Sequence, residues 1–398
     1  MDKIYERSNI LIQDQSLAFT RSLSHHIDWT DRLIGILGSR GTGKTTLLLQ
    51  QLKQTFGPGT QAVYLSLDDI YFTHNRLVDF AENFRQQGGK LLLLDEVHRY
   101  PNWAREIKNI YDFYKDLRII FTGSSVVDML RQNADLSRRA VQYELTGLSF
   151  REFLELSGIG HFPTHSLKDI FANHTAIAAG LTNHFKPLQY FQEYLAIGYF
   201  PFFTENKSTY PYRLEQVVRL IIESDLQFVK GYDPHNSRKI YQLLYLLAIS
   251  VPFKPNVSKL SEKIGLHRNT LMEYLHYVDK ARLANTLLAA GKTTSTLQKP
   301  DKLFLENTNL HFALAPGIVN KGTLRESFFL NQLRNAGHSI TLPPAGDFLV
   351  DDTFTIEIGG KGKSSTQIAS LPNAWIAADD LEIGNANKIP LWLFGFLY

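Results

Sequence analysis

The sequence predicts an α/β protein whose first part is an open parallel β-sheet. Short apolar runs that suit buried strands alternate with helical stretches over the first third of the chain, which is the pattern of a parallel sheet covered by helices. A glycine-rich turn follows the first of these strands, and an acidic pair follows a later one. The chain has 398 residues, which is too long for one ordinary core, so we expect three domains.

The composition excludes some classes of protein. Hydrophobic residues make up 44% of the chain and charged residues 20%, which is typical of a folded protein. The absence of cysteine excludes disulfides, thiolate metal sites and cysteine nucleophiles. The N-terminus lacks a basic start followed by an apolar stretch, and the most apolar segment, 240–253, is too short to span a bilayer. We therefore expect a cytoplasmic protein with no membrane partner.

Residues 38–45 read GSRGTGKT and have the composition of a phosphate-binding loop. They lie between an apolar run at 33–37 and a helical stretch at 46–52, so a strand turns directly into a helix. The three glycines allow backbone N–H groups to converge on phosphate at the positive end of that helix. Lys44 is expected to neutralise the β and γ phosphates of ATP, and the Thr45 hydroxyl to reach Mg²⁺. The residues expected to bind the nucleotide are Gly38, Ser39, Arg40, Gly41, Thr42, Gly43, Lys44, Thr45 and Thr46.

A second motif stands at the end of a later strand. Residues 61–68 and 90–94 have strand patterns separated by a helical stretch at 74–87, and four consecutive leucines indicate that the later strand is buried on both faces. Asp95 is expected to hold Mg²⁺, and Glu96 to orient and deprotonate the attacking water. An acidic pair after a strand is often only a solvated turn, but after a phosphate loop we favour the catalytic interpretation over a glycine-rich turn that binds nothing.

A fourth strand, at 118–122, ends in Gly123-Ser124-Ser125. If it lies between the two motif strands, it places a hydroxyl group beside the γ-phosphate. We select Ser124 for this sensing role; Thr122 is the competing residue, and a simple helix N-cap by Ser124 or Ser125 is the alternative.

Two arginines precede a fifth strand at 141–145. Arginine is the preferred clamp for developing phosphoryl charge, so Arg138 or Arg139 is expected to reach a γ-phosphate, in the same chain or across a subunit boundary. We select Arg139. The alternative is an ordinary solvated surface arginine.

Strand patterns are absent from 148 to 235, where apolar residues recur at helical spacing. We interpret this segment as a helical lid over the nucleotide. Its aromatic stretch, 199–203, is expected to pack in a core rather than bind a cofactor.

Residues 238–305 have the pattern of a winged helix, with three amphipathic helices followed by two strand-like pieces. Residues 257–306 contain eight Lys or Arg against five Asp or Glu, an excess equal to the +3 charge of the whole chain, so a nucleic-acid surface is expected here first. Winged helices also serve as protein contacts or ATPase lids, and that alternative stays open. The residues expected to enter a DNA groove or to contact phosphates are His267, Arg268, Asn269, Thr270, His276, Lys292 and Lys299.

The last segment begins with a helix at 323–330 and continues into strand-like pieces. Residues 347–350 and 353–358 are expected to form a hairpin. The apolar end of the chain, 389–398, is expected to be buried.

Three carboxylates of this segment are candidate metal ligands. Glu326, Asp347 and Glu357 provide the oxygen donors that divalent cations prefer, and they are expected to converge on one metal ion. The alternative is that they are ordinary surface and hairpin residues of an inactive scaffold.

Together these motifs resemble a prokaryotic group of AAA+-type ATP-binding proteins, in which the ATPase module is followed by a winged helix and a restriction-endonuclease-like domain of unknown function. The resemblance covers essentially the whole chain. It implies a P-loop NTPase sheet of strand order 5-1-4-3-2 and nucleotide roles for Lys44, Thr45, Asp95, Glu96 and Ser124. The motifs that carry it are GSRGTGKT at 38–45, LLLLDEVHRYPNW at 91–103, FTGSS at 121–125, RR at 138–139 followed by GLSFREF at 147–153, and KLFLENTNLHFAL at 302–314.

The resemblance implies a division into four parts. We expect an AAA+-type ATPase core at 1–147, a helical lid at 148–235, a winged helix at 236–316 and a nuclease-like α/β domain at 317–398.

The nuclease-like domain departs from the pattern of its group. Such folds usually carry an acid, then Asp, then Glu-x-Lys; Glu326 and Asp347 match the first two positions. After Glu357, however, Gly359 stands where the lysine is expected, and Lys361 comes two residues later. A displaced lysine, Lys361 or Lys363, would need a bulge in the strand. We therefore expect this domain to be inactive as a nuclease.

Three functions remain open at this point. The leading one is an ATPase that binds and hydrolyses Mg-ATP as a conformational switch for a DNA or protein partner. The second is an ATP-dependent DNA-processing enzyme with an active nuclease. The third is a non-catalytic scaffold that binds ATP for stability. An oligomer is compatible with all three.

Overall fold

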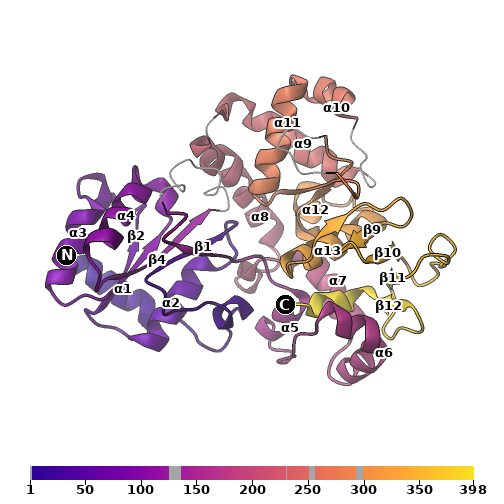
Figure 1. Cartoon of the computed structure of the whole chain (residues 1–398), viewed down its shortest axis with the longest axis horizontal. Helices are drawn as coiled ribbons and strands as arrows, with labels where there is room; N and C mark the ends of the chain where they lie inside the picture. The colour runs from indigo at the N-terminus through magenta and orange to yellow at the C-terminus, as the bar shows by residue number, and fades with distance from the viewer. Residues whose placement is uncertain (1, 125–135, 230, 251–255, 293–298) are drawn as a thin grey trace. The chain divides into compact units, whose positions relative to one another are not determined.

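Five parallel strands form the first sheet, in the order β2-β3-β4-β1-β5. Figure 1 labels β1, β2 and β4 of this sheet. Neighbouring strands pair in parallel throughout, so β4 lies between the two strands that carry the sequence motifs, β1 and β3. The expected order 5-1-4-3-2 is therefore confirmed, read from the opposite edge. The strands are β1 Leu33–Gly38, β2 Ala62–Ser66, β3 Leu91–Asp95, β4 Arg118–Ser124 and β5 Val141–Glu144.

The structure is a computed structural model that describes residues 2–124, 136–229, 231–250, 256–292 and 299–398. Its contacts divide the chain into two compact units, each described by itself. The short segment 225–232 packs with the first unit, although the residues before and after it in the chain belong to the second. The division into four parts stays a prediction. The first unit comprises 1–146 and 225–232, and the second comprises 147–224 and 233–398.

Helices cover both faces of the first sheet because its central strands are apolar on both faces. Leu92 and Leu94 belong to one hydrophobic core, whereas Leu91 and Leu93 belong to the other, as the alternation of side chains along a strand requires. The expected strand buried on both faces is therefore confirmed. The helices of this unit are α1 Asp2–Gln13, α2 Lys44–Thr55, α3 Leu77–Gln86 and α4 Trp103–Phe113, with short 3₁₀ turns η1 Ser22–His25, η2 Ile70–Thr73 and η3 Val97–Arg99.

The second unit begins with helices, as expected from the missing strand patterns. Ser149 starts the first of them with a capping box, because its side chain accepts from the backbone of Glu152 and the Glu152 side chain accepts from the backbone of Ser149. The aromatic stretch packs in the core, since the rings of Phe153 and Phe203 lie 5.0 Å apart. The helices are α5 Phe150–Leu156, α6 Leu167–Thr182, α7 Pro187–Ile197 and α8 Tyr210–Leu220, with η6 Pro201–Thr204 and a π-helical turn Ile221–Asp225 after α8.

Three helices and a hairpin follow, in the order that the winged-helix pattern predicts. β6 and β7 pair in antiparallel fashion. The tip of the expected wing, 293–298, lies outside the described residues, and the winged-helix interpretation stays a prediction. An additional helix follows the hairpin and was not expected. These elements are α9 Ser237–Ile249, α10 Val257–Ile264, α11 Arg268–Lys280, β6 Ala284–Leu287, β7 Lys302–Leu305 and α12 Thr308–Leu314.

The C-terminal part contains a second, mixed sheet of order β12-β11-β10-β9-β8 beside a long helix. The expected hairpin is confirmed: β9 and β10 are antiparallel, and Asp351 and Asp352 turn between them with φ of 50° and 51°. The apolar end of the chain is buried, as expected. Among the described residues, no helix combines the length and apolar character that a membrane crossing requires. The elements are α13 Lys321–Asn335, β8 Ile340–Thr341, β9 Phe348–Val350, β10 Phe354–Gly359, β11 Ala374–Ala378, β12 Lys388–Pro390 and η10 Leu391–Phe396.

Candidate active site

The phosphate loop leaves the carboxyl end of β1 and enters α2 directly. Gly41 and Gly43 have φ of 80° and 95°, a region of backbone conformation that residues with a side chain rarely adopt. Gly43 is the N-cap residue, so the free N–H groups of the first turn of α2 face the loop. Within this loop Ser39 and Thr42 are buried, whereas Thr46 is exposed on α2.

Lys44 lies inside the loop. Its Nζ donates hydrogen bonds to the carbonyl oxygens of Gly38 and Ser39, at 2.8 and 2.9 Å, and the residue is only 5% exposed. Burial lowers the pKa of Lys44, although the carboxylates of Glu96 and Asp95 oppose the shift. An incoming phosphate can replace the two carbonyl oxygens as the partner of this buried ammonium group.

Arg21, which the sequence motifs did not indicate, binds the phosphate loop through its guanidinium group. Its guanidinium donates to the carbonyl of Thr42 at 2.7 Å and to that of Thr146 at 2.9 Å, and the residue is 5% exposed. The sequence does not predict these contacts, because the partners of Arg21 are 21 and 125 residues away.

Asp95 is the last residue of β3, and both oxygens of its carboxylate accept hydrogen bonds. It accepts hydrogen bonds from Thr45 Oγ1 at 2.6 Å, from Tyr64 OH at 2.8 Å and from Thr122 Oγ1. Burial, and secondly the nearby charge of Asp95, raise the pKa of Tyr64, so this phenol stays a donor. Thr45 and Asp95 thus present two hard oxygen atoms side by side, which is the donor set that Mg²⁺ prefers.

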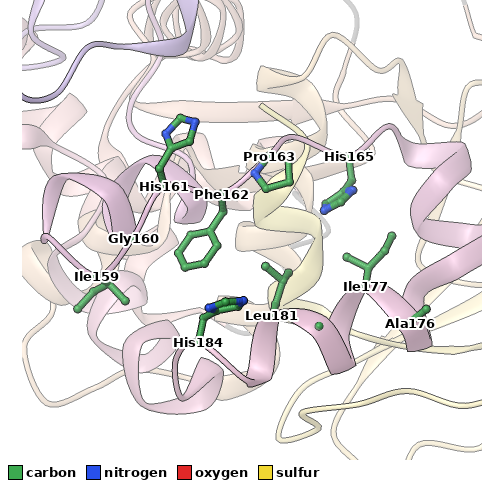
Figure 2. Close-up of a pocket in the computed structure, with 11 residues that line it drawn as sticks. Ile159, Gly160, His161, Phe162, Pro163, His165, Ala176, Ile177, Leu181 and His184 are labelled. Atoms are coloured by element: carbon green, nitrogen blue, oxygen red, sulfur yellow. The ribbon is translucent and has the colours of Figure 1, made fainter.

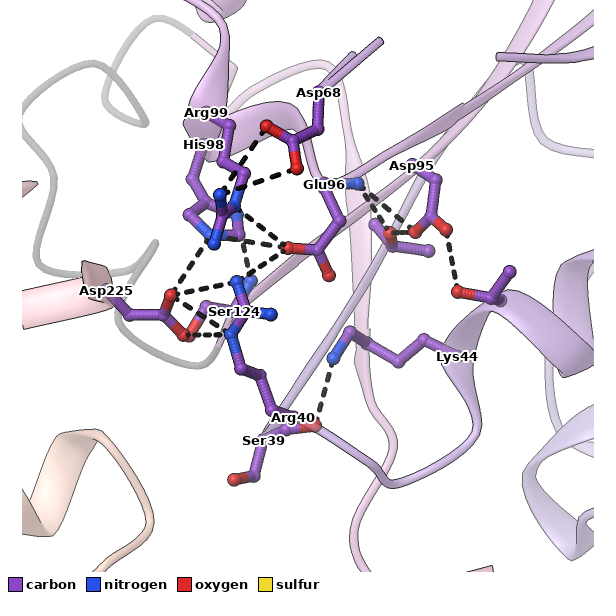
Figure 3. Close-up of polar contacts among 12 residues, drawn as sticks. Ser39, Arg40, Lys44, Asp68, Asp95, Glu96, His98, Arg99, Ser124 and Asp225 are labelled. Atoms are coloured by element: carbon purple, nitrogen blue, oxygen red, sulfur yellow. Dashed lines mark hydrogen bonds and ion pairs between the residues drawn. The ribbon is translucent and has the colours of Figure 1, made fainter. Parts of the chain in front are cut away.

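Glu96 turns the chain away from the sheet with φ of 55° and ψ of 40°. A residue with a side chain rarely adopts this conformation, and such strained positions cluster at functional sites. Its N–H group donates to Asp95 Oδ1 at 3.1 Å and to Thr122 Oγ1 at 3.2 Å, which fixes the turn. The side chain is 23% exposed and points back over the loop (Figure 3).

Arg40 and Asp225 form an ion pair beside Glu96, in which Asp225 is buried and Arg40 is half-buried (Figure 3). Arg40 Nε lies 3.1 and 3.0 Å from the two carboxylate oxygens of Asp225, and Arg40 Nη2 lies 3.1 Å from Oδ1. Burial raises the pKa of a carboxyl group, but the neighbouring His98 and Arg40 outweigh it, so the pKa of Asp225 is lowered. Sequence reasoning missed Asp225, because it stands 185 residues from Arg40.

The predicted sensor residues lie at the end of β4. Ser124 is buried, and its backbone N–H donates to His98 Nδ1 at 3.4 Å. Thr122, the competing residue, connects Asp95 and the Glu96 backbone. The sensing role of Ser124 stays a prediction, and the N-cap alternative depends on residues 125–135, which lie outside the described part of the chain.

Arg139 lies at the opposite end of the sheet from the phosphate loop. β5 pairs with the beginning of β1, so the residues just before β5 are at the amino-terminal edge. Arg139 donates to both carboxylate oxygens of Asp112 on α4, at 2.9 and 3.0 Å. This position does not favour a role in its own site, and a role across a subunit boundary stays a prediction.

The candidate DNA-contacting residues are spread over the surface of the second unit. His267, Arg268 and Asn269 are exposed at the start of α11, while Thr270 and His276 are half-buried. Lys292 Nζ lies 2.7 and 2.8 Å from the carboxylate oxygens of Asp301, so its charge is already compensated. Lys299 is exposed.

The three C-terminal acids lie near one another, but two of them are paired with lysines. Lys302 Nζ is 2.6 Å from Glu326 Oε2, and Lys363 Nζ is 2.5 Å from Glu357 Oε1. Burial raises the pKa of Glu326; Lys302 opposes the shift, and the charges of Asp347 and Glu357 add to it. In the described ranges, no three acidic or histidine side chains are arranged to hold a metal ion as they stand.

Lys361 is not the lysine that approaches Glu357. β10 ends at Gly359, so the regular strand that would return Lys361 to the same face does not continue. The chain turns instead, and Lys361 is exposed. The stem of Lys363 passes over Gly359, where an added Cβ would lie 2.6 Å from Lys363 Cβ and Cγ.

A separate hollow of about 430 Å³ opens on the second unit between the connection 159–165 and the C-terminal half of α6 (Figure 2). Three imidazoles, of His161, His165 and His184, line it together with Phe162 and aliphatic side chains. They point in different directions in Figure 2 and do not form a metal-binding group. None of the predicted site residues lies there.

Two parts of the chain match known protein families. Residues 30–154 match the AAA domain family, and residues 188–317 match a domain of unknown function, DUF8612. The chain is 27% identical over 395 residues to "Uncharacterized protein MJ1637" of Methanocaldococcus jannaschii, a match that covers 90% of this chain and 81% of that protein. The similarity of residues 30–154 to the AAA domain family supports a nucleotide-binding ATPase domain in this part of the chain.

Three solved structures show weak similarity. AMPPCP-bound DnaA from Aquifex aeolicus has a TM-score of 0.26 at 18% identity, with 65% of this chain and 84% of that chain covered. PCH-2 of C. elegans has a TM-score of 0.23 at 17% identity, with 40% and 46% covered. A katanin structure concerned with self-assembly has a TM-score of 0.26 at 14% identity, with 42% and 60% covered. Scores of this size support no conclusion about this chain.

Proposed function

We propose that this protein binds Mg-ATP at its phosphate loop, hydrolyses it, and uses the nucleotide state as a conformational switch for a DNA or protein partner. The observation that carries the proposal is the meeting of Lys44, Thr45, Asp95 and Glu96 at the carboxyl ends of β1 and β3. In open α/β sheets, ligands bind at this edge.

The residues at the loop fit a metal-bound triphosphate. The N–H groups at the start of α2 and the ammonium group of Lys44 provide positive charge for the phosphates. Thr45 and Asp95 offer adjacent oxygen atoms for the cation. When bound, Mg²⁺ offsets the negative charge that develops on the phosphoryl oxygens.

Glu96 is the proposed general base. Its carboxylate accepts a proton from the attacking water as the oxygen of that water bonds to the γ-phosphorus and the bond to ADP breaks. Mg-ATP and water thereby become ADP and inorganic phosphate. Phosphate release by the parent protein and by the Glu96→Gln protein tests this assignment, because the amide keeps the shape of the side chain without its basicity.

The switch is supported by the path of the chain around Asp225. Segment 225–232 packs in the first unit, yet it is joined covalently to α8 on one side and to the residues leading to α9 on the other. Asp225 holds Arg40 of the phosphate loop. If the phosphate loop rearranges around the nucleotide, Arg40 transmits the change to Asp225 and thus to segment 225–232. The chain continues from both ends of this segment into the second unit.

For DNA as the partner, we expect binding that is mostly electrostatic and passes through Arg268. Phosphate contacts release counterions, so the affinity for a DNA duplex should fall steeply between 50 and 200 mM salt, by about 10³-fold for six or more contacts. Arg268→Glu should weaken binding at low salt by at least about 10-fold, measured by fluorescence anisotropy. Lys168→Glu, an exposed charge reversal on α6, is the control. Equal affinity of the parent and Arg268→Glu proteins would favour a protein-contact role for α11.

A second candidate function is metal-dependent DNA cleavage by the C-terminal domain. The observation in its favour is the ammonium group of Lys363 at 2.5 Å from Glu357, because this lysine supplies the cation that Gly359 lacks. Phosphodiester cleavage needs carboxylates for the metal and a cation or base near the nucleophile. The observation against it is that Lys302 pairs with Glu326 and Lys363 with Glu357, so two of the three carboxylates already have a cationic partner.

We expect the parent protein to leave supercoiled plasmid essentially uncut in Mg²⁺ or Mn²⁺, with and without ATP, because lysines neutralise Glu326 and Glu357. Gel electrophoresis of the plasmid measures nicking. Cleavage that disappears in both Asp347→Ala and Lys363→Ala would contradict this expectation and establish the second candidate. Cleavage that persists in both would indicate a contaminating nuclease.

A further inference from the structure

The described contacts of the Glu96 carboxylate all fall on one of its two oxygens. Arg40 Nη2 lies 3.3 Å from Glu96 Oε2, His98 Nε2 lies 3.5 Å from it, and Arg99 Nε lies 3.8 Å from it (Figure 3). Arg40 Nη2 donates a hydrogen bond to Oε2, and the nitrogens of His98 and Arg99 are longer, ion-pair contacts to the same oxygen. Oε1 is the oxygen left to accept a proton from water.

The His98 ring places its Nε2 atom between the carboxylates of Glu96 and Asp225. Ser124 N–H donates to Nδ1, so the proton of the neutral ring is on Nε2. This Nε2 is buried, without a hydrogen-bond partner among the described residues, and lies 3.5 Å from Glu96 Oε2 and 3.6 Å from Asp225 Oδ1. Phe228 packs edge-on against the ring, with the ring centres 5.9 Å apart. An unpaired buried donor is costly, so a group that moves to meet it is stabilised there.

Asp225 holds Arg40, the residue that donates a hydrogen bond to Glu96 Oε2. The Asp225 side chain is completely buried, and its two oxygens hold the guanidinium through Nε and Nη2. A two-point contact of this kind fixes the plane of the guanidinium and compensates its charge. Without Asp225, the Arg40 charge would be free to pair with both oxygens of Glu96 and to remove the proton acceptor.

We propose that Asp225 and His98 are positioning residues for ATP hydrolysis: Asp225 fixes Arg40, and Arg40 and His98 together hold Glu96 Oε2 so that Oε1 faces the attacking water. This inference rests on the proposed function, in which Glu96 is the general base. It assigns a role in the chemistry to two residues outside both the phosphate loop and the acidic pair Asp95-Glu96.

The test compares full-length Asp225→Asn, Arg40→Gln and the double variant. Each single change is expected to lower kcat roughly 10- to 100-fold, because orientation of the base is lost. Asp225→Asn is also expected to leave ATP affinity within about threefold, because Lys44 and Thr45 remain, whereas Arg40→Gln removes a residue of the phosphate loop itself and is compared by kcat alone. The double variant is expected to be no slower than the slower single variant, because both changes break one link. Asp116→Asn is the matched control, since Asp116 also holds an arginine by two oxygens, at 2.7 and 2.9 Å from Arg85 Nε, but on the exposed surface.

His98 is tested with two variants of similar size. His98→Gln keeps an N–H donor near the position of Nε2, whereas His98→Leu has none. The Gln variant should stay within about fivefold of the parent kcat, and the Leu variant should lose roughly 10- to 100-fold at unchanged ATP affinity. Melting temperatures and nucleotide binding confirm that each variant is folded.

The possible failures are distinguishable. Parent-like kcat in Asp225→Asn, or losses that multiply in the double variant, overturn the role of Asp225, and equal kcat in the two His98 variants overturns that of His98. If Asp225→Asn does not fold, parent-like kcat in Arg40→Gln overturns the link to Glu96. A parent protein that releases no phosphate, with Asp116→Asn equally inactive, overturns the proposed function and this inference with it.

Discussion

The Glu96→Gln protein is expected to bind ATP as tightly as the parent and to lose at least about 100-fold in turnover. An amide cannot accept the proton of the attacking water, and general-base catalysis contributes about 10²- to 10⁴-fold. Arg40, His98 and Arg99 surround one oxygen of this side chain, so the amide still finds partners and the fold is kept. Phosphate release under saturating Mg-ATP and equilibrium nucleotide binding measure the two effects separately.

Glu82→Gln is the matched control, because Glu82 is an exposed carboxylate of α3 in the same unit. It should leave both turnover and binding unchanged. Turnover by Glu96→Gln at the parent rate would show that Glu96 is not the base. Loss of nucleotide binding in the same variant would show that Glu96 holds the nucleotide rather than activating water.

The first sheet was predictable because each of its signals is local. Four leucines in succession require a strand with two apolar faces, and the structure divides Leu91 to Leu94 between two cores. The glycine-rich loop needs only its own residues to turn from β1 into α2. An acidic pair directly after a buried strand must emerge at the carboxyl edge, where Asp95 and Thr45 are found 2.6 Å apart.

The surroundings of Glu96 were not predictable, because their partners are distant in sequence. Asp225 has no motif of its own and reaches Arg40 across 185 residues. A buried acid after a helix gives no sign of its partner until the path of the chain is known. His98 and Arg99 lie beside the acidic pair, and they were missed because their side chains return toward the site through the short turn η3.

The C-terminal acids show how a spacing rule can fail. A lysine two residues after Glu357 would share its face of the strand, but Gly359 stands there, and Lys361 and Lys363 are the nearest lysines that follow. In the structure β10 ends at Gly359, and Lys363 reaches Glu357 from the following turn. The glycine leaves the space that the Lys363 stem fills. The strands β11 and β12 were missed for a different reason, since they are short and lack clear alternation.

The Lys44→Ala protein is expected to lose nucleotide binding by at least about 100-fold while remaining folded. Charge-assisted hydrogen bonds contribute about 1.5–3 kcal/mol each, so loss of a lysine that serves two phosphates exceeds the 2.7 kcal/mol that corresponds to 100-fold. Burial lowers the pKa of Lys44, so the folded state binds this proton less tightly than the unfolded chain does, and the charge opposes folding at pH values below the lowered pKa. The variant should therefore melt within a few degrees of the parent without nucleotide, whereas Mg-ATP should raise the melting temperature of the parent and of the exposed control Lys90→Ala only. An equal rise in Lys44→Ala would mean that the phosphates are held elsewhere.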